Sequence, residues 1–214
     1  MSELFGTGEL IFDTFVQMAS TLGYENVKMK DIAGMAGIKT ASIYSHFKSK
    51  RKILECAYNY YTEHLYDNRM SADKIKKMIE TASAKKIIDA LSYTFESEDR
   101  KKYIRMILIT KLVYMRLFQD LLANEIFAEA NLRNSEYVID ILKHGIDIGR
   151  IDGSLDVKTF TDVLIGAKVV MGVRAFAGAD YEAAQLGQEK RIMALFVRFL
   201  SSFLKPVGQK KPGA

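Results

Sequence analysis

The sequence has very few of the residues that support disulfide frameworks or histidine chemistry. Cys56 is the one cysteine among 214 residues, which excludes an intramolecular disulfide framework. Its neighbours on an expected helix are apolar, and we predict that it is a small buried hydrophobic residue. The three histidines share no metal-ligand spacing and have no nucleophile motif beside them. We therefore expect neither an enzyme, nor a metal site, nor a cofactor.

Proline and long apolar runs are also scarce. No proline occurs before Pro206, which favours long uninterrupted helices. Charged residues break every apolar run well short of the roughly 18 residues that a transmembrane helix needs. Glu3 and Glu9 precede the first apolar run, and no small-residue cleavage site follows it, so no signal peptide is expected. These absences predict a cytoplasmic protein without a membrane anchor.

The remaining pattern is helical throughout, with no strand alternation and no internal repeat. It predicts an all-α fold in which an N-terminal three-helix domain is joined through a long helix to a C-terminal helical bundle. The expected domains are residues 1–50, residues 51–205 and a flexible tail at 206–214. The expected helices are 7–22, 29–36, 40–47, 50–69, 72–82, 84–95, 98–118, 120–131, 134–149, 156–177 and 182–204.

The most informative segment runs from Met29 to Leu54 and has the plan of a helix-turn-helix. Ala33 and Ala36 lie one turn apart, where two steeply crossed helices need small residues. Gly37 can supply the left-handed conformation that ends the first helix. Ile43 and Phe47 are spaced to bury one face of the second helix, which predicts that its other face is free to bind.

That other face carries short or planar hydrogen-bonding side chains, which suit base edges and phosphate oxygens in a major groove. Between residues 24 and 52, seven lysines and arginines stand against Glu25 and Asp31, a local excess of positive charge within a net charge of +5 for the chain. Such a confined basic patch predicts docking on phosphates. A second group of lysines between residues 74 and 86 is interpreted as a solvated helix face and is assigned no site.

The segment resembles the DNA-binding domain of the tetracycline-repressor (TetR) family of bacterial transcriptional regulators. The resemblance covers about 50 residues and rests on Gly23-Tyr24, Asp31-Ile32-Ala33, Ala36-Gly37-Ile38, Ile43-Tyr44, His46-Phe47, Lys50 and Ile53-Leu54. It implies that Tyr44 and Lys50 contact the phosphate backbone, and that Thr40, Ala41, Ser42 and Ser45 face the bases or the flanking sugar-phosphate. The predicted DNA-binding set is Lys28, Lys30, Lys39, Thr40, Ala41, Ser42, Tyr44, Ser45, His46 and Lys50.

Two positions depart from the family pattern. Lys28 and Lys39 stand where the family usually has a hydroxyl residue that caps the second and third helices. A lysine side chain cannot accept a hydrogen bond from a backbone N–H. The start of the recognition helix is therefore left open, with Thr40 as an alternative cap, and we expect both lysines to reach phosphates instead.

The segment from Met106 to Phe118 is apolar over most of its circumference and is expected inside the bundle. Methionine and aromatic side chains can repack around a guest, although such a stripe is more often ordinary core. The family resemblance implies a ligand cavity, for a small hydrophobic effector. The residues predicted to line it are Met106, Tyr114, Met115, Phe118, Tyr137, Ile141, His144 and Met171.

The last two expected helices are both strongly apolar, which suggests a surface completed by a second copy of the chain. A four-helix dimer interface is predicted, with a self-contained core as the alternative. The residues predicted for it are Phe160, Val163, Leu164, Ala167, Ile192, Leu195, Phe196, Phe199 and Phe203.

Together these features predict a sequence-specific DNA-binding transcriptional regulator. Two recognition helices related by a two-fold axis would bind a near-palindromic operator in double-stranded DNA. A ligand that prefers a state with wrongly spaced helices would lower the affinity for DNA, so a dimeric repressor released by its effector is expected. The alternative is a helical dimerisation or adaptor protein whose DNA binding has weakened.

Overall fold

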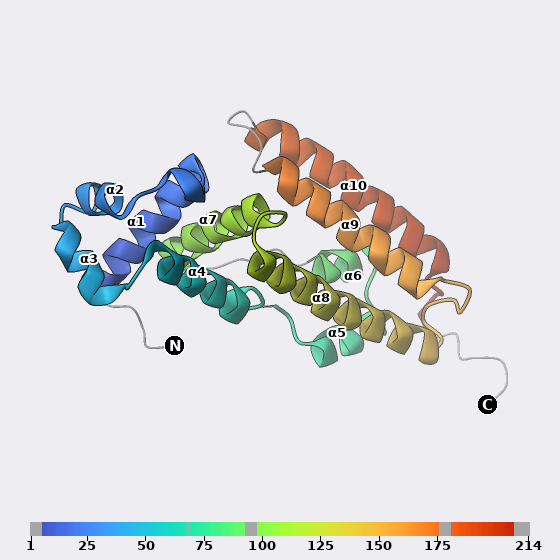
Figure 1. The fold of residues 1–214 in the computed structure, drawn as a ribbon. Helices are drawn as coiled ribbons and strands as arrows, with labels where there is room; N and C mark the ends of the chain where they lie inside the picture. The colour runs from blue at the N-terminus through green and yellow to red at the C-terminus, as the bar shows by residue number, and fades with distance from the viewer. Residues whose placement is uncertain (1–5, 68, 93–97, 176–180, 208–214) are drawn as a thin grey trace. The chain divides into compact units, whose positions relative to one another are not determined.

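The structure, a computed structural model, describes residues 6–67, 69–92, 98–175 and 181–207, and for 175 and 181–189 it describes the backbone alone. In these ranges the protein is helical, with one isolated bridge between Ile151 and Leu204 and no strand. The elements are α1 (Thr7–Leu22), η1 (Tyr24–Asn26), α2 (Met29–Met35), α3 (Thr40–His46), α4 (Lys50–His64), α5 (Ala72–Ile79), α6 (Ala84–Leu91), α7 (Arg100–Arg116), α8 (Leu121–Asp147), α9 (Val157–Ala175) and α10 (Tyr181–Phe203). The predicted all-α fold is confirmed (Figure 1).

The chain packs into two compact units. The first consists of Met1–Asn68 with Phe95–Ala128, and the second of Arg69–Thr94 with Glu129–Ala214. Helix α8 starts in the first unit and ends in the second. This division describes packing, so the functional domains predicted at 1–50, 51–205 and 206–214 stay a prediction.

In the first unit, the segment that resembles a helix-turn-helix forms two short helices that pack on α1 (Figure 1). Gly37 follows α2 with φ +67°, the left-handed conformation that glycine adopts without steric cost. Two hydrogen bonds complete a Schellman motif there, from the Ile38 N–H to the Ala33 carbonyl at 3.0 Å and from the Gly37 N–H to the Gly34 carbonyl at 3.3 Å. The role predicted for Gly37 is confirmed.

The core of the first unit is built on α1, α4 and α7. Phe12 and Phe15 of α1 are fully buried, as are Ile53 and Leu54 of α4. Helix α7 packs along α1 and α4 in the same unit. Cys56, predicted to be buried, is only partly so, because it lies at the edge of the buried face of α4.

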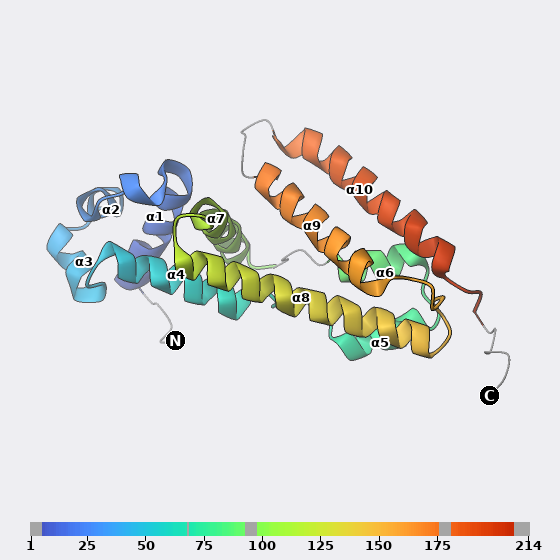
Figure 2. The ribbon, with the colours of Figure 1, turned by 45° about the vertical axis from the view of Figure 1, so that its right-hand side comes forward.

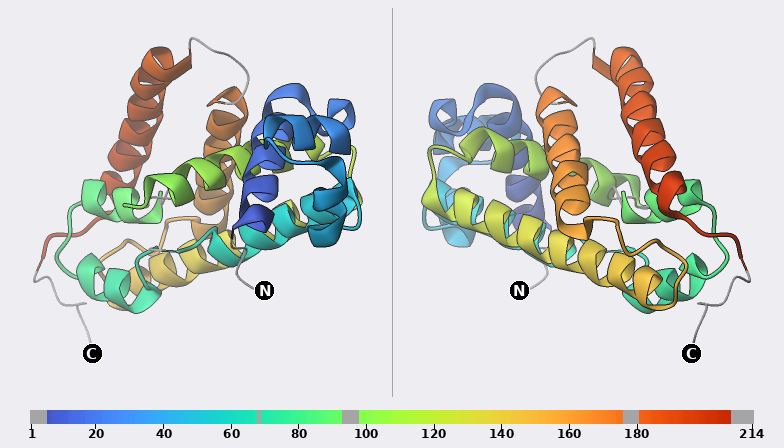
Figure 3. Two further views of the ribbon diagram at one scale, coloured as in Figure 1. Left: turned by 90° about the vertical axis from the view of Figure 1, so that its left-hand side faces the viewer. Right: turned by 90° about the vertical axis from the view of Figure 1, so that its right-hand side faces the viewer.

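The second unit buries one continuous apolar cluster. It joins α5 and α6 to the second part of α8 and to α9 and α10. Figures 2 and 3 show α6 beside the C-terminal part of α10, where the two helices pack. Past α10, the Asp152 N–H donates to the Phe203 carbonyl at 2.8 Å and the Lys205 N–H to the Arg150 carbonyl at 3.0 Å, so this end of the described chain is fixed to the loop between α8 and α9.

Several predicted helix ends were wrong. The helices expected at 120–131 and 134–149 are one helix, α8, since the residues between them include neither proline nor glycine to end it. The helix expected at 50–69 ends at His64, where the Asp67 N–H bonds to the His64 carbonyl at 3.1 Å. The expected cavity helix starts at Arg100, with Asp99 as its cap.

Gly145 of α8 is packed too closely to carry a larger side chain. A Cβ atom there would lie 2.6 Å from Cδ1 of Ile151 and 3.0 Å from Cδ1 of Ile79, and both isoleucines are buried in the core. We expect Gly145→Ala to lower the free energy of unfolding by about 1–2 kcal/mol despite the better helix propensity of alanine. Urea denaturation measures the change.

Gly34→Ala in α2 is the matched control, because a Cβ at Gly34 would meet nothing within 4 Å. Helix propensity predicts that this control gains up to about 1 kcal/mol. Equal effects of the two substitutions would contradict the packing proposed around Gly145.

Candidate nucleic-acid interface

Helix α3 presents one polar face and buries the other. Ile43 and Phe47 point inward and are 0% and 5% exposed, whereas Tyr44 is 54% exposed. Ala41, Ser45 and His46 are also exposed, and Thr40 and Ser42 are partly buried. The Ser45 hydroxyl donates to the Ser42 carbonyl at 2.7 Å, within the same face. The short helix therefore offers hydroxyl, imidazole and phenol groups to a partner.

The starts of α2 and α3 settle which residues cap them. Lys28 precedes α2, and its N–H donates to the Asp31 carboxylate at 3.0 Å, while its carbonyl accepts from the Asp31 N–H at 2.9 Å. Asp31 thus supplies the acidic half of a capping box, and no side chain caps α2 from position 28. Lys39 precedes α3, and its carbonyl accepts from the Ser42 N–H at 2.9 Å. Thr40 is the first helical residue, so the alternative in which it caps the recognition helix is wrong.

The basic patch remains open to solvent near these helices. Lys28, Lys30 and Lys39 are exposed, and none of the three forms an ion pair with a described residue. Cations without an internal partner are available to an anionic ligand, which keeps them in the predicted DNA-binding set.

The three cations that begin α4 all have partners, which the sequence did not predict. The Lys50 ammonium donates to the Tyr24 carbonyl at 2.8 Å and lies 4.1 Å from the centre of the Tyr24 ring. Burial lowers the pKa of Lys50. Arg51 pairs with Asp120, and Lys52 pairs with Glu55 at 2.6 Å. Cations at the start of a helix oppose its dipole, and these contacts stabilise them there without a bound phosphate. The Lys50 ammonium has three donors and donates one to the Tyr24 carbonyl, so it can still donate to another acceptor.

Asp120 is the centre of a buried polar network that the sequence analysis missed. Its carboxylate accepts from Arg51 at 2.5 Å and from the Tyr58 hydroxyl at 3.1 Å, and it lies 3.6 Å from Arg116. Arg116 also pairs with Glu25 at 2.7 Å and stacks 4.6 Å from the centre of the Tyr24 ring. The network ties the end of α7 and the start of α8 to α4 and to η1, next to Lys50.

The predicted ligand set is divided between the two units. In the first unit Met106 is buried, Tyr114 packs edge-on against Phe127 at 5.3 Å, and Met115 and Phe118 are 40% and 93% exposed. Burial raises the pKa of Tyr114.

In the second unit Ile141 is fully buried, and the Tyr137 hydroxyl donates to the Met70 carbonyl at 2.5 Å. His144 and Met171 are partly buried. The predicted lining residues fall in both units, so the ligand-binding set stays a prediction.

The predicted dimer set divides by burial. Phe160, Leu164 and Phe196 are at most 9% exposed and belong to the core of one chain, where the Phe160 and Phe196 rings meet edge-on at 5.7 Å. For these three the self-contained core is the better interpretation. Val163, Leu195 and Phe199 are 56%, 57% and 51% exposed. The other predicted members, Ala167, Ile192 and Phe203, are partly buried.

Two further observations bear on function. Among the described residues, no group of three histidine, cysteine or acidic side chains could hold a metal ion. No helix in the described ranges is both long and apolar enough to cross a membrane.

Comparison with known proteins identifies what this arrangement is similar to. Residues 11–57 match the family model described as bacterial regulatory proteins, tetR family. The chain is 26% identical over 184 residues to the HTH-type transcriptional repressor KstR2 of Mycolicibacterium smegmatis, an alignment that covers 83% of this chain and 85% of that protein.

Two solved structures share the fold over nearly the whole chain. The ketosteroid transcriptional regulator KstR2 of Mycobacterium tuberculosis aligns with a TM-score of 0.60 at 19% identity, over 96% of this chain and all of that one. The transcriptional regulator FadR of Bacillus subtilis, solved in complex with stearoyl-CoA, aligns with a TM-score of 0.56 at 21% identity, over 88% of this chain and 97% of that one. The family predicted from residues 29–54 is the family whose model matches.

Proposed function

Because this chain belongs to the tetR family of bacterial regulatory proteins and is a DNA-binding transcription factor rather than an enzyme, we propose that it is a cytoplasmic dimeric repressor. Its operator is a near-palindrome, and a small hydrophobic effector releases it. The observation that carries the proposal is the exposed polar face of α3, whose opposite side is buried through Ile43 and, just after the helix, Phe47.

The DNA contacts follow from the geometry of α3 and its surroundings. A major groove accepts one helix, and α3 offers Tyr44, Ser45 and His46 from its exposed face. Lys28, Lys30 and Lys39 neutralise phosphates beside that groove, and Lys50 reaches one with its remaining donors. Thr40, Ala41 and Ser42 complete the set at the start of the helix.

The dimer is proposed on apolar side chains that the second unit leaves exposed. Helices α9 and α10 pack against each other, and each carries large apolar residues with about half of their area open to solvent. Those on α9 are Val163, Val170 and Val173, and those on α10 are Leu195 and Phe199. The same helices from a second copy would bury both stripes in a four-helix interface. Two recognition helices would then enter major grooves about 34–36 Å apart.

The effector is proposed to be hydrophobic because the residues predicted to line its cavity are mainly apolar. The regulator FadR, which shares the fold, is complexed with stearoyl-CoA, a molecule with a long apolar chain. Binding to a state with wrongly spaced recognition helices lowers the affinity for the operator by the same factor that the operator lowers the affinity for the effector.

Removing two phosphate contacts tests the function directly. We expect the double variant Tyr44→Ala with Lys50→Ala to bind DNA about 100-fold more weakly, since hydrogen bonds to charged groups are lost in each half-site. Fluorescence anisotropy with a labelled duplex from the upstream region of its own gene measures the affinity. The slope of log affinity against log salt should also become shallower.

Lys86→Ala is the matched control. Lys86 is an exposed lysine on α6, in the cluster that is assigned no site, and its loss should leave the affinity unchanged. Tight binding that survives the double substitution would refute the assigned interface. No binding by the unaltered protein at either low or high salt would favour the adaptor alternative.

A further inference from the structure

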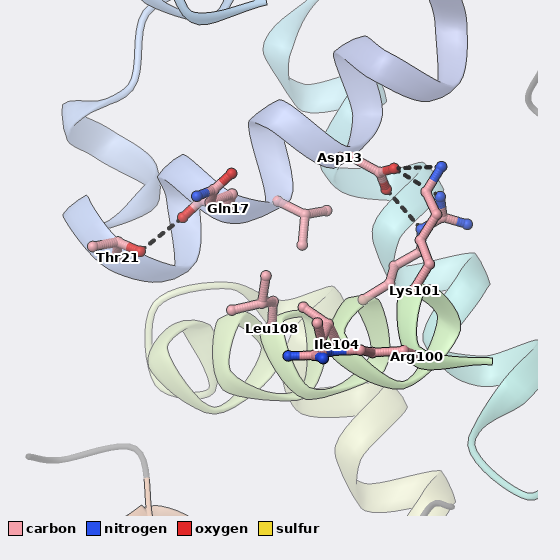
Figure 4. A pocket seen from close by; sticks show the side chains of 9 residues that line it. Asp13, Gln17, Thr21, Arg100, Lys101, Ile104 and Leu108 are labelled. Carbon is pink, nitrogen blue, oxygen red and sulfur yellow. Dashed lines mark hydrogen bonds and ion pairs between the residues drawn. The ribbon is translucent and has the colours of Figure 1, made fainter. Parts of the chain in front are cut away.

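A groove of about 750 Å³ runs between α1 and α7 inside the first unit (Figure 4). Its apolar wall consists of Val16 from α1 with Ile104 and Leu108 from α7. Ile104 is 44% exposed, although it stands between two packed helices. The volume lies in the range of sites for small molecules, which are concave and mostly apolar with a few placed polar groups.

One end of the groove is closed by ion pairs. Arg105 binds the Asp13 carboxylate through two nitrogens, at 2.7 and 2.9 Å, and also reaches Glu9 at 2.7 Å. Lys101 pairs with Glu9 at 2.8 Å and with Asp13 at 3.3 Å. Figure 4 shows Asp13 and Lys101 turned toward each other. Two cations and two carboxylates therefore neutralise each other at this end.

Arg100 also lines the groove, but unlike Lys101 and Arg105 it is not part of this ion-pair cluster. It lines the same space, is exposed, and forms no ion pair or hydrogen bond through its side chain with any residue in the described ranges. In Figure 4 its side chain extends along α7 beside Ile104. A guanidinium binds a carboxylate through two parallel donors, so an unpaired arginine beside an apolar wall favours a ligand that is apolar with one anionic end.

The opposite end of the groove, at Gln17 and Thr21, is polar (Figure 4). Gln17 of α1 is exposed there. The Thr21 hydroxyl, one turn further along α1, donates to the backbone carbonyl of Gln17 at 2.8 Å. Among its described lining residues the groove thus offers apolar contact along its middle, the unpaired cation Arg100, and a single carboxylate, Asp13, which is held by Arg105 and Lys101.

We propose that this groove binds a small amphipathic carboxylate, with its chain on Val16, Ile104 and Leu108 and its head group on Arg100. The site lies on α1 as well as α7 and is separate from the effector cavity expected in the helical bundle. It goes beyond the proposed function, since binding here requires neither DNA nor dimerisation. A ligand held by both helices would also fix α1, on which α2 and α3 pack, against α7.

Titration calorimetry with sodium decanoate, on the full chain without DNA, tests the site. We expect Arg100→Gln to weaken decanoate binding about fivefold, the upper range for an exposed ion pair. Ile104→Glu should weaken it more than tenfold, because it sets a like charge on the apolar wall. The uncharged probe decanol should bind the unaltered protein more weakly than decanoate and should not respond to Arg100→Gln.

Arg133→Gln on α8 is the matched control. Arg133 is also an exposed arginine, it pairs only with Glu129 among the described residues, and its loss should leave the decanoate affinity unchanged. Circular dichroism checks that each variant is folded. If Ile104→Glu does not fold, Arg100→Gln still tests the site, because Arg100 is exposed and its replacement disturbs no packing. The proposal is overturned if decanoate does not bind, or if Arg100→Gln and Arg133→Gln bind it with equal affinity. The decanoate titration contains no DNA, so its outcome does not affect the DNA titration that tests the proposed function. Either proposal can therefore fail without the other.

Discussion

Replacing Asp120 with alanine is expected to lower the free energy of unfolding by about 2–3 kcal/mol, because hydrogen bonds to a buried carboxylate are lost. The Asp120 side chain is 4% exposed and accepts from Arg51 and from the Tyr58 hydroxyl. It also accepts the Leu122 N–H at 3.1 Å, at the start of α8. Alanine would leave the 9% exposed Arg116 side chain without this neighbouring charge.

The charge state of Asp120 supports this expectation. Burial alone would raise its pKa, but the hydrogen bonds from Arg51 and Tyr58 outweigh burial and hold the pKa below its ordinary value. A carboxylate with a lowered pKa contributes stability above its unfolded pKa and loses it as the pH falls through the folded pKa. The contribution of Asp120 is therefore complete at neutral pH.

Thermal and urea unfolding at pH 7 measure the effect. Asp120→Asn should cost less than Asp120→Ala, because an amide oxygen still accepts hydrogen bonds although the charge is gone. Asp89→Ala is the matched control, since its side chain is 55% exposed and its pair with Lys85 is on the surface. That control should change the stability by less than about 0.5 kcal/mol, and an equally small effect at Asp120 would show that the network contributes little.

The helix-turn-helix was predictable because its determinants are local. Gly37, Ile43 and Phe47 act over a few residues: a left-handed turn, and apolar positions one helical turn apart. Even the departures were informative, since Lys28 and Lys39 do precede α2 and α3. What remained open was the start of the recognition helix, because a lysine at the cap position offers no side-chain acceptor that would mark it.

The network and the groove were not predictable, because both join residues far apart in the sequence. Asp120 meets Arg51 and Tyr58 across more than 60 positions, and Arg105 meets Asp13 across 92. A single sequence gives the charge of each residue but not its partner. The sequence predicted Lys50 at the start of α4. It did not predict that the Lys50 ammonium donates to the Tyr24 carbonyl, because that contact depends on how η1 folds.

The apolar residues of the last two helices illustrate a third case. Helical spacing identified them together, but spacing cannot divide those that face the core of one chain from those that face a partner. The structure makes that division: Phe160, Leu164 and Phe196 are buried, whereas Val163 and Leu195 are 56% and 57% exposed. A prediction about the dimer therefore belongs to the exposed group alone.

The double variant Val163→Glu with Leu195→Glu is expected to convert the proposed dimer into a monomer. Both residues are more than half exposed in one chain, so a carboxylate at either position stays solvated in the monomer and leaves its fold intact. In a two-fold interface each substitution occurs twice, so four carboxylates would be buried without partners, and burying an unpaired charge is strongly unfavourable. Sedimentation velocity at micromolar concentration measures the mass.

Leu132→Glu is the control, because Leu132 is a similarly exposed leucine at 59%, on α8 and outside the proposed interface. It should leave the mass of the assembly unchanged. The monomeric variant should also bind the operator about 100-fold more weakly or worse, since two linked half-site contacts become one and the gain from effective concentration is lost. A variant that stays dimeric would place the interface elsewhere. A monomer that binds DNA with unchanged affinity would instead refute the need for a paired recognition helix, even though the α9 and α10 surface had been assigned correctly.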